Sequence, residues 1–189
     1  MTSDVVRAGT PRAVSPTRIS AAHVTIVSGS LALLARPASS AFVAITVIVA
    51  IAGSLHRLPD GARTHGDRRS WLAAVALGVV SFAAARGALG GSLLLPPTAW
   101  VLVSVTVAAV AEELFFRRFM FGVLAGRGIP LALAISSVTF ALVHVTFWGW
   151  RVVPVDLAAG VLLGWQRWVT GSWTAPALTH ATANILMLL

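Results

Sequence analysis

Residues 111–120 read AEELFFRRFM and place four charged side chains inside one of the most apolar regions of the chain. Glu112 and Glu113 stand side by side there, although the whole sequence has only six acidic residues. A charged side chain in hydrocarbon is costly unless it is paired or faces a cavity. The stretch therefore raises two questions: whether the chain lies in a membrane, and what its charges do there.

The composition of the 189-residue chain is that of a membrane protein. Charged residues make up 11% of it, where a soluble globular domain has about 25%. No cysteine is present, which excludes disulfides and thiolate chemistry. The pattern predicts an all-α fold, a polytopic transmembrane helical bundle. Its seven apolar segments are residues 20–35, 40–55, 71–94, 98–125, 130–147, 153–169 and 173–189.

These segments divide the chain into three regions. A polar tail covers residues 1–19, and N-terminal transmembrane segments with one polar loop at 56–70 cover residues 20–97. Residues 98–189 form the third region. The first two segments are about 15 residues long, which is short for a hydrocarbon core of about 30 Å.

The arginines indicate an orientation. Many fall on one side of the predicted spans: Arg7, Arg12, Arg18, Arg57, Arg63, Arg68, Arg69, Arg127 and Arg167. The other side has Arg36, Arg86 and Arg151. By the positive-inside rule the N-terminus is cytoplasmic and, after seven spans, the C-terminus lies outside. Because the arginines separate apolar segments, the net charge of +8 indicates topology and no nucleic-acid partner.

Glu112 and Glu113 are expected to differ in their partners. Glu113 and Arg117 are four residues apart in a helical run, so they share a face, with the acid before the base. Glu112 is rotated by about 100° from Glu113 and is left without an evident local partner. In one interpretation both acids simply pair with the arginines of the stretch. In the other, an unpaired intramembrane glutamate marks a functional site.

Two later segments supply polar groups that could join Glu112. Phe140 and His144 are four residues apart in one segment, and His180 and Asn184 are four apart in another. Glu112 and His144 are equally far from Gly128, where the intervening hairpin turns, so they should lie at the same depth.

The depth of the site depends on where the membrane surface lies. If Arg117 and Arg118 mark the cytoplasmic interface, Glu112 lies about 8 Å and His180 about 12 Å beneath it. The three polar side chains would then meet in a cavity near the cytoplasmic face.

A carboxylate with two imidazoles can activate water in two ways. Glu112 and His144 could act as general bases, with His180 and Asn184 donating hydrogen bonds to an oxyanion. Alternatively, a zinc ion could be held by Glu112, His144 and His180, although no HExxH signature is present. Either route leads to hydrolysis of an amide by water. Ser104, Ser136 and Ser137 lack an evident histidine neighbour, so no serine nucleophile is expected.

Three short motifs in this order resemble a known family. Residues 112–117 (EELFFR) fit EExxxR, residues 140–144 (FALVH) fit FxxxH, and residues 180–184 (HATAN) fit HxxxN. The chain resembles the CPBP family, which includes CAAX prenyl endopeptidases and bacterial bacteriocin-processing or self-immunity proteins (the ABI group). The resemblance covers about residues 98–189.

The resemblance implies an intramembrane endopeptidase, described for the family both as a metalloprotease and as a glutamate-dependent protease. Glu112 and His144 would activate the water, while His180 and Asn184 would stabilise the oxyanion or complete a metal site. The supporting residues would be Glu113, Arg117 and Phe140. Bacterial members generally have no prenylated substrate, so a peptide or membrane-protein substrate in a bacterial plasma membrane is expected.

Two other functions use the same residues. A non-catalytic immunity or scaffold protein could bind a peptide or partner in the same cavity, and a small transporter or proton relay would also need intramembrane Glu and His.

The remaining polar residues receive structural interpretations. Arg118 is expected at the interface. Asp156 is expected near a helix N-terminus, where an acid is favourable, and this structural role is preferred over a role beside the site. Gly160 and Gly164 form a small-xxx-small pair for helix packing. A surface or packing role is expected for His23, His56 and His65.

Overall fold

The computed structural model describes residues 16–36, 41–56, 58, 67–89 and 97–188. The elements within these ranges are all helical and follow in the order α1 (Pro16–Leu34), α2 (Ala41–Ser54), α3 (Arg68–Leu89), α4 (Ala99–Glu113), η2 (Leu114–Met120), α5 (Phe121–Ala125), α6 (Ile129–Val143), α7 (Val145–Trp148), η3 (Trp150–Val152), α8 (Val153–Thr170) and α9 (Thr174–Leu188).

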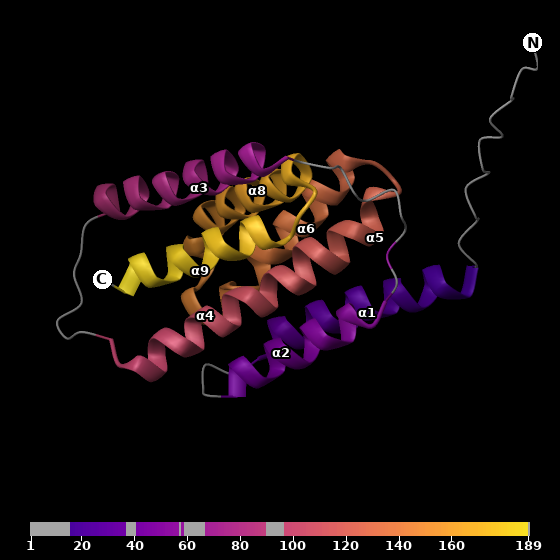
Figure 1. The fold of residues 1–189 in the computed structure, drawn as a ribbon. Helices are drawn as coiled ribbons and strands as arrows, with labels where there is room; N and C mark the ends of the chain where they lie inside the picture. Colours follow the sequence, from indigo (N-terminus) through magenta and orange to yellow (C-terminus); the bar gives the residue numbers. More distant parts are fainter. Residues whose placement is uncertain (1–15, 37–40, 57, 59–66, 90–96, 189) are drawn as a thin grey trace, which may run out of the picture.

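The long helices form one bundle in which α3 runs along one side and the α1–α2 hairpin along the other (Figure 1). Between them, α4 packs against α2 and α9, α6 packs against α8, and α9 also contacts α3. Successive long helices alternate in direction. One end of the bundle therefore holds the starts of α1, α3, α6 and α9, and the other holds the starts of α2, α4 and α8.

The helices confirm the prediction of an all-α membrane bundle. By length and composition, three helical stretches in the described part of the chain could cross a membrane, namely Arg68–Ala88, Ala99–Ala125 and Ile129–Trp148. Residues 21–34 and 41–54 form shorter apolar helices, as expected for the first two segments. Segment 130–147 departs from the prediction, because α6 ends at Val143 and a separate short helix, α7, follows His144.

The helix that carries the two glutamates is continuous from Ala99 to Ala125, but it is not a regular α-helix throughout. Thr98 caps its first turn by accepting a hydrogen bond from the Val101 amide. Directly after Glu113, residues Leu114–Met120 form a π-helix. Such widened turns are frequent at functional sites. The sequence pattern did not predict this change of winding.

The contact between α6 and α8 depends on the small residues expected to pack there. A Cβ atom on Gly160 would lie 3.0 Å from Cα of Ser137, and one on Gly164 would lie 2.5 Å from Cδ1 of Leu133. The first distance is tighter than ordinary Cβ contacts and meets backbone, and the second would require the end of the Leu133 side chain to move, so the glycines allow the close approach. The packing interpretation of the pair is confirmed.

Candidate active site

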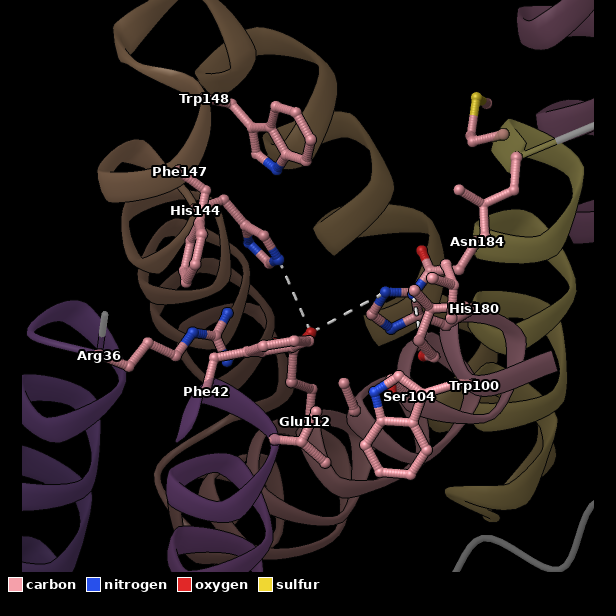
Figure 2. Close-up of a pocket in the computed structure, with 16 residues that line it drawn as sticks. Arg36, Phe42, Trp100, Ser104, Glu112, His144, Phe147, Trp148, His180 and Asn184 are labelled. Atoms are coloured by element: carbon pink, nitrogen blue, oxygen red, sulfur yellow. Dashed lines mark hydrogen bonds and ion pairs between the residues drawn. The ribbon is translucent and has the colours of Figure 1, made fainter. Parts of the chain in front are cut away.

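The carboxylate of Glu112 lies between two imidazole rings that come from other helices (Figure 2). Its Oε2 atom is 3.6 Å from Nε2 of His144 and 3.9 Å from Nε2 of His180. Glu112 belongs to α4, His144 follows the last residue of α6, and His180 lies in α9. Side chains expected at one depth thus meet in space.

The partners of the imidazoles determine which ring nitrogen carries the proton. Nδ1 of His144 is 2.8 Å from the carbonyl oxygen of Phe140, an atom that can only accept a hydrogen bond. Nδ1 of His180 is 2.9 Å from Oε1 of Glu113, which is likewise an acceptor when ionised. Both Nδ1 atoms therefore donate. In its neutral form, each ring presents the lone pair of Nε2 toward Glu112.

Glu112 has a cationic partner, so the expectation that it is unpaired was wrong. Nη1 of Arg36 lies 2.7 Å from Oε1 of Glu112, and both side chains are buried. Arg36 also donates to Oγ1 of Thr46, and its guanidinium lies 5.0 Å from the centre of the Phe147 ring. The partner comes from the residues after α1, far away in the sequence. Helical spacing around the glutamates therefore gave no sign of it.

Glu113 and Arg117 form the predicted pair, which is completely buried. Nε of Arg117 is 3.2 Å from Oε2 of Glu113, and Nη2 donates to the carbonyl of Gly160 in α8. The backbone carbonyl of Arg117 in turn accepts from Nε of Arg167. With its other oxygen Glu113 holds His180. This acid therefore links the helix packing to the orientation of an imidazole at the site.

Phe140 occupies the space between these charged groups. Its ring centre is 4.7 Å from the ring of His144, 5.4 Å from the ring of His180 and 4.4 Å from the guanidinium carbon of Arg117. The ring separates the two imidazoles from the buried arginine, and its own carbonyl orients His144. These contacts agree with a supporting role.

Asn184 lies one turn beyond His180 and lines the same pocket (Figure 2). Its Nδ2 donates to the carbonyl of Val105 at 3.3 Å. An amide nitrogen carries two hydrogens, so this bond uses one of the two donors.

Asp156 lies both at a helix N-terminus and beside the site, the two roles considered for it from the sequence. It lies in the first turn of α8, where an acid favours the helix N-terminus. Its Oδ2 atom also lies 3.7 Å from Nδ1 of His144. The second contact places a further carboxylate on the side of the imidazole that faces away from Glu112.

The other polar residues take structural positions where the chain is described. Nη1 of Arg118 donates to the carbonyl of Ser54 at the end of α2. His56 contacts Oγ1 of Thr25 and stacks on Phe119, which confirms its packing role. His23 is half-buried in α1. His65 lies outside the described residues.

The predicted depth of the site depended on Arg117 as an interfacial residue, but Arg117 does not have the exposed position of one. It is fully buried, and the helical run continues past it to Ala125. Glu112 stands midway along this run, about 20 Å from Ala99 at 1.5 Å per residue. Glu112 therefore lies near the middle of the helical run and not close to its C-terminal end.

A cavity of about 640 Å³ extends from Glu112 toward the end of the bundle where α4 begins. This volume is in the range of small-molecule sites. Polar groups of Arg36, Glu112, His144, His180 and Asn184 converge in it. The walls are mostly apolar and include Phe42, Val101, Val105, Phe147, Met187 and Leu188. Trp100 and Trp148, which are 70% and 71% exposed, also line the cavity.

The donors at the site have the chemistry of zinc ligands but not the spacing. In each imidazole Nδ1 is held by an acceptor and Nε2 is directed into the site, which is also the arrangement of zinc-binding histidines. Among the described residues, however, no group of three His or acidic side chains is arranged to hold a metal ion. The guanidinium of Arg36 also already provides a positive charge to Glu112. As placed, these side chains do not enclose a metal.

Comparison with known protein families gives a match over the second half of the chain. The sequence model of the Rce1-like family, described as type II CAAX prenyl endopeptidase Rce1-like, matches residues 94–186. No curated protein and no solved structure matches the chain. The matched residues contain all three motifs and the helices α4 to α8, together with most of α9. Residues 94–186 thus match the Rce1-like family of type II CAAX prenyl endopeptidases, and this match supports a CPBP-family intramembrane protease.

Proposed function

We propose that the chain is an intramembrane endopeptidase that hydrolyses a peptide bond with water activated by Glu112 and the two histidines. The observation that carries this proposal is the position of Oε2 of Glu112, which faces both Nε2 atoms deep in an apolar cavity. The match of residues 94–186 to a family of endopeptidases supports the reaction class. The substrate is a peptide or a segment of a membrane protein.

In the proposed reaction, Glu112 and His144 act on the water. The water oxygen attacks the carbonyl carbon, and its proton passes to Oε2 of Glu112 or Nε2 of His144. The neutral ring of His144 is suited to this role, since its Nδ1 already donates to Phe140. The same proton is later given to the departing amine nitrogen when the C–N bond breaks.

The oxyanion formed in the first step needs hydrogen-bond donors. His180 is one proposed donor, because its Nδ1 is held by Glu113 while its Nε2 faces the space beside Oε2 of Glu112. The second N–H of Asn184 is the other donor proposed. Donors held in place before the reaction lower the barrier more than mobile water does.

We further propose that the reaction is glutamate-dependent and requires no metal. The supporting observations are the ion pair between Arg36 and Glu112 and the spacing of the three candidate ligands. Arg36 supplies the positive charge that holds the carboxylate in place. Water activation then uses side chains of this chain alone.

The proposed setting is a bacterial plasma membrane, crossed by seven helical segments with the N-terminus in the cytoplasm. Three stretches long enough to span support a membrane location. The distribution of the arginines supports the orientation.

The test compares peptides released from membranes that carry the wild-type chain or Glu112→Gln at matched expression. The substitution keeps the shape of the side chain and an acceptor for Arg36, but it removes the base. We expect wild-type-specific fragments whose release falls by roughly 100- to 10,000-fold in the variant. Equal release from both membranes would overturn the proposal and leave a binding or immunity role for the same cavity.

A further inference from the structure

The cavity opens at one particular end of the bundle. Its lining includes residues where helices begin or end: Arg36 after α1, Phe42 in α2, Trp100 in α4, Trp148 in α7 and Leu188 in α9. We call this the open end. The exposed indoles of Trp100 and Trp148 stand there, so the cavity reaches the surface at the open end.

The opposite end of the bundle, which we call the closed end, holds the turns at residues 126–128 and 171–173 and the starts of α1 and α3. None of the described residues in these turns lines the cavity. Phe115, Phe116, Phe119 and Met120 are buried between Glu112 and this end. A path from the closed end to Glu112 is therefore filled by side chains.

The two ends differ in positive charge. In the sequence, eight arginines lie before α1, in its first turn, between α2 and α3, at the start of α3 or in the turn at 126–128: Arg7, Arg12, Arg18, Arg57, Arg63, Arg68, Arg69 and Arg127. Segments at the open end carry Arg36, Arg86 and Arg151. Arg36 is committed to Glu112, and Nε of Arg86 donates to the carbonyl of Leu186. Loops rich in arginine stay in the cytoplasm, which makes the closed end cytoplasmic.

The open end also has the side chains of a membrane–water interface. Trp100, Trp148 and Trp150 are 70%, 71% and 72% exposed there. Indole rings favour the headgroup region of a bilayer, where the ring is partly apolar and its N–H meets water. The mouth of the cavity is thus positioned at the membrane surface that faces away from the cytoplasm.

We propose that the active site is reached from the non-cytoplasmic side, and that the substrates are secreted peptides or membrane-anchored proteins with a flexible segment on that side. This inference rests on the proposed proteolytic function. It does not depend on the prenylated substrates in the family's name. Glu112 lies about 20 Å below Ala99, a depth that about six extended residues cover. A folded segment would not fit into a cavity of about 640 Å³, so the scissile segment must enter in an extended conformation.

Single cysteines can test the access side, since the chain has no cysteine of its own. Thr146→Cys places a thiol at the open end beside the cavity residue Phe147, and Gly126→Cys places one at the closed end. Both positions are exposed, and a Cβ on Gly126 would meet only the carbonyl of Val123 at 3.9 Å. Neither change removes an arginine, so the charge balance between the two ends is kept.

The probe is a membrane-impermeant maleimide, applied to right-side-out and inside-out membrane vesicles and normalised to labelling in detergent. We expect Thr146→Cys to react at least ten times more in right-side-out vesicles, and Gly126→Cys to show the opposite preference. The reversed pattern, or equal labelling in both preparations, would overturn the inference. Trp148→Cys and Ser70→Cys, at an exposed position near the start of α3, provide a second pair if either first variant fails to fold.

This labelling needs no substrate, so its result is independent of the test with Glu112→Gln. Reversed labelling together with Glu112-dependent cleavage would leave the protease in place and move its substrates to the cytoplasm. The expected labelling without cleavage would instead remove the protease and keep a cavity that opens outward.

Discussion

Arg36 and Glu112 form a buried ion pair that joins the first helical hairpin to the family-matched core: Nη1 of the arginine lies 2.7 Å from Oε1 of the glutamate. The pair occupies one carboxylate oxygen and leaves the other, Oε2, facing both histidines. Arg36 lies outside residues 94–186, where the family match is found. The proposed catalytic carboxylate is therefore positioned by a part of the chain that carries none of the three motifs.

Removing the charge of Arg36 should disable the site. Arg36→Met keeps an apolar stem but leaves Glu112 without its partner, a change worth on the order of 3–5 kcal/mol for a buried pair. Either the hairpin loosens or Glu112 takes up a proton and no longer acts as a base. We expect cleavage to fall at least about 100-fold, the lower range for losing a general base. Cleavage assays on membranes at matched expression would measure this.

Two variants make the test of Arg36 specific. Arg36→Lys retains a positive charge without the planar guanidinium, so it should recover part of the activity. Arg151→Met removes an exposed arginine from the same end of the bundle and should leave cleavage unchanged. Wild-type activity in Arg36→Met would show that Glu112 needs no cation.

Glu113 should be more important for folding than Glu112, although the two are neighbours. Its side chain is completely buried between Arg117 and His180. Glu113→Gln would turn an acceptor into a donor beside the buried guanidinium, which is destabilising by on the order of 3–5 kcal/mol. Glu112→Gln also removes a charge, the one opposite Arg36, but its amide oxygen still accepts from the guanidinium and the side chain lines the cavity, so the loss of thermal stability should be smaller.

Thermal unfolding of the two variants in detergent measures this difference. The expected order of midpoints is wild type, Glu112→Gln and then Glu113→Gln. If Glu112→Gln were the less stable of the two, the assignment of one acid to chemistry and the other to structure would be wrong.

Chelation separates the two ways of activating water. With the metal-free route, cleavage that depends on Glu112 should persist, within about twofold, after prolonged incubation with a strong zinc chelator. The measurement is the cleavage rate before and after treatment, together with the zinc content of the purified protein. Loss of activity on chelation and its return on adding zinc would contradict the glutamate-dependent proposal.

The sequence predicted the contacts that short spacing controls. Glu113 and Arg117 pair because they are one helical turn apart, and Glu112 meets His144 because one hairpin turn lies midway between them. Two features were missed. Arg36 reaches Glu112 only through the packing of the α1–α2 hairpin, and the π-helix after Glu113 alters the winding without an apolar signature. Contacts made by distant helices leave no periodic trace in a single sequence.

The depth of the site shows a related limit. Arg117 resembled an interfacial residue because arginine in a membrane usually lies at the surface. The structure provides instead a carboxylate, a backbone carbonyl and an aromatic ring around its guanidinium. A sequence gives the charge of a residue, but the partners that make burial possible come from the fold.

A methyl group at position 160 should disturb the site indirectly, through the backbone carbonyl of Gly160 that holds Arg117. Gly160→Ala would bring a Cβ to 3.0 Å from Cα of Ser137 and shift the carbonyl that accepts from Arg117. Overpacking of this kind destabilises by about 1–3 kcal/mol. Gly87→Ala in α3 is the matched control, because nothing lies within 4 Å of the added Cβ. It should be neutral or stabilising by up to about 1 kcal/mol, since alanine favours a helix. Unfolding midpoints that fell equally for both would contradict the close packing of α6 and α8.

Asp156 can be tested for a role beyond its helix terminus. If the carboxylate stabilises the protonated ring of His144 at 3.7 Å, Asp156→Asn should lower the cleavage rate about tenfold, or ~1.4 kcal/mol of transition-state stabilisation. If it only favours the start of α8, the change should reduce stability by about 0.3–1 kcal/mol and leave the rate unaltered. We expect the loss of rate. The carboxylate lies beside Nδ1 of His144, so it can stabilise the positive charge that forms when Nε2 of the same ring takes up the proton. Asp156→Glu keeps the charge and should restore part of the rate, whereas equal rates in all three proteins would limit Asp156 to the helix terminus.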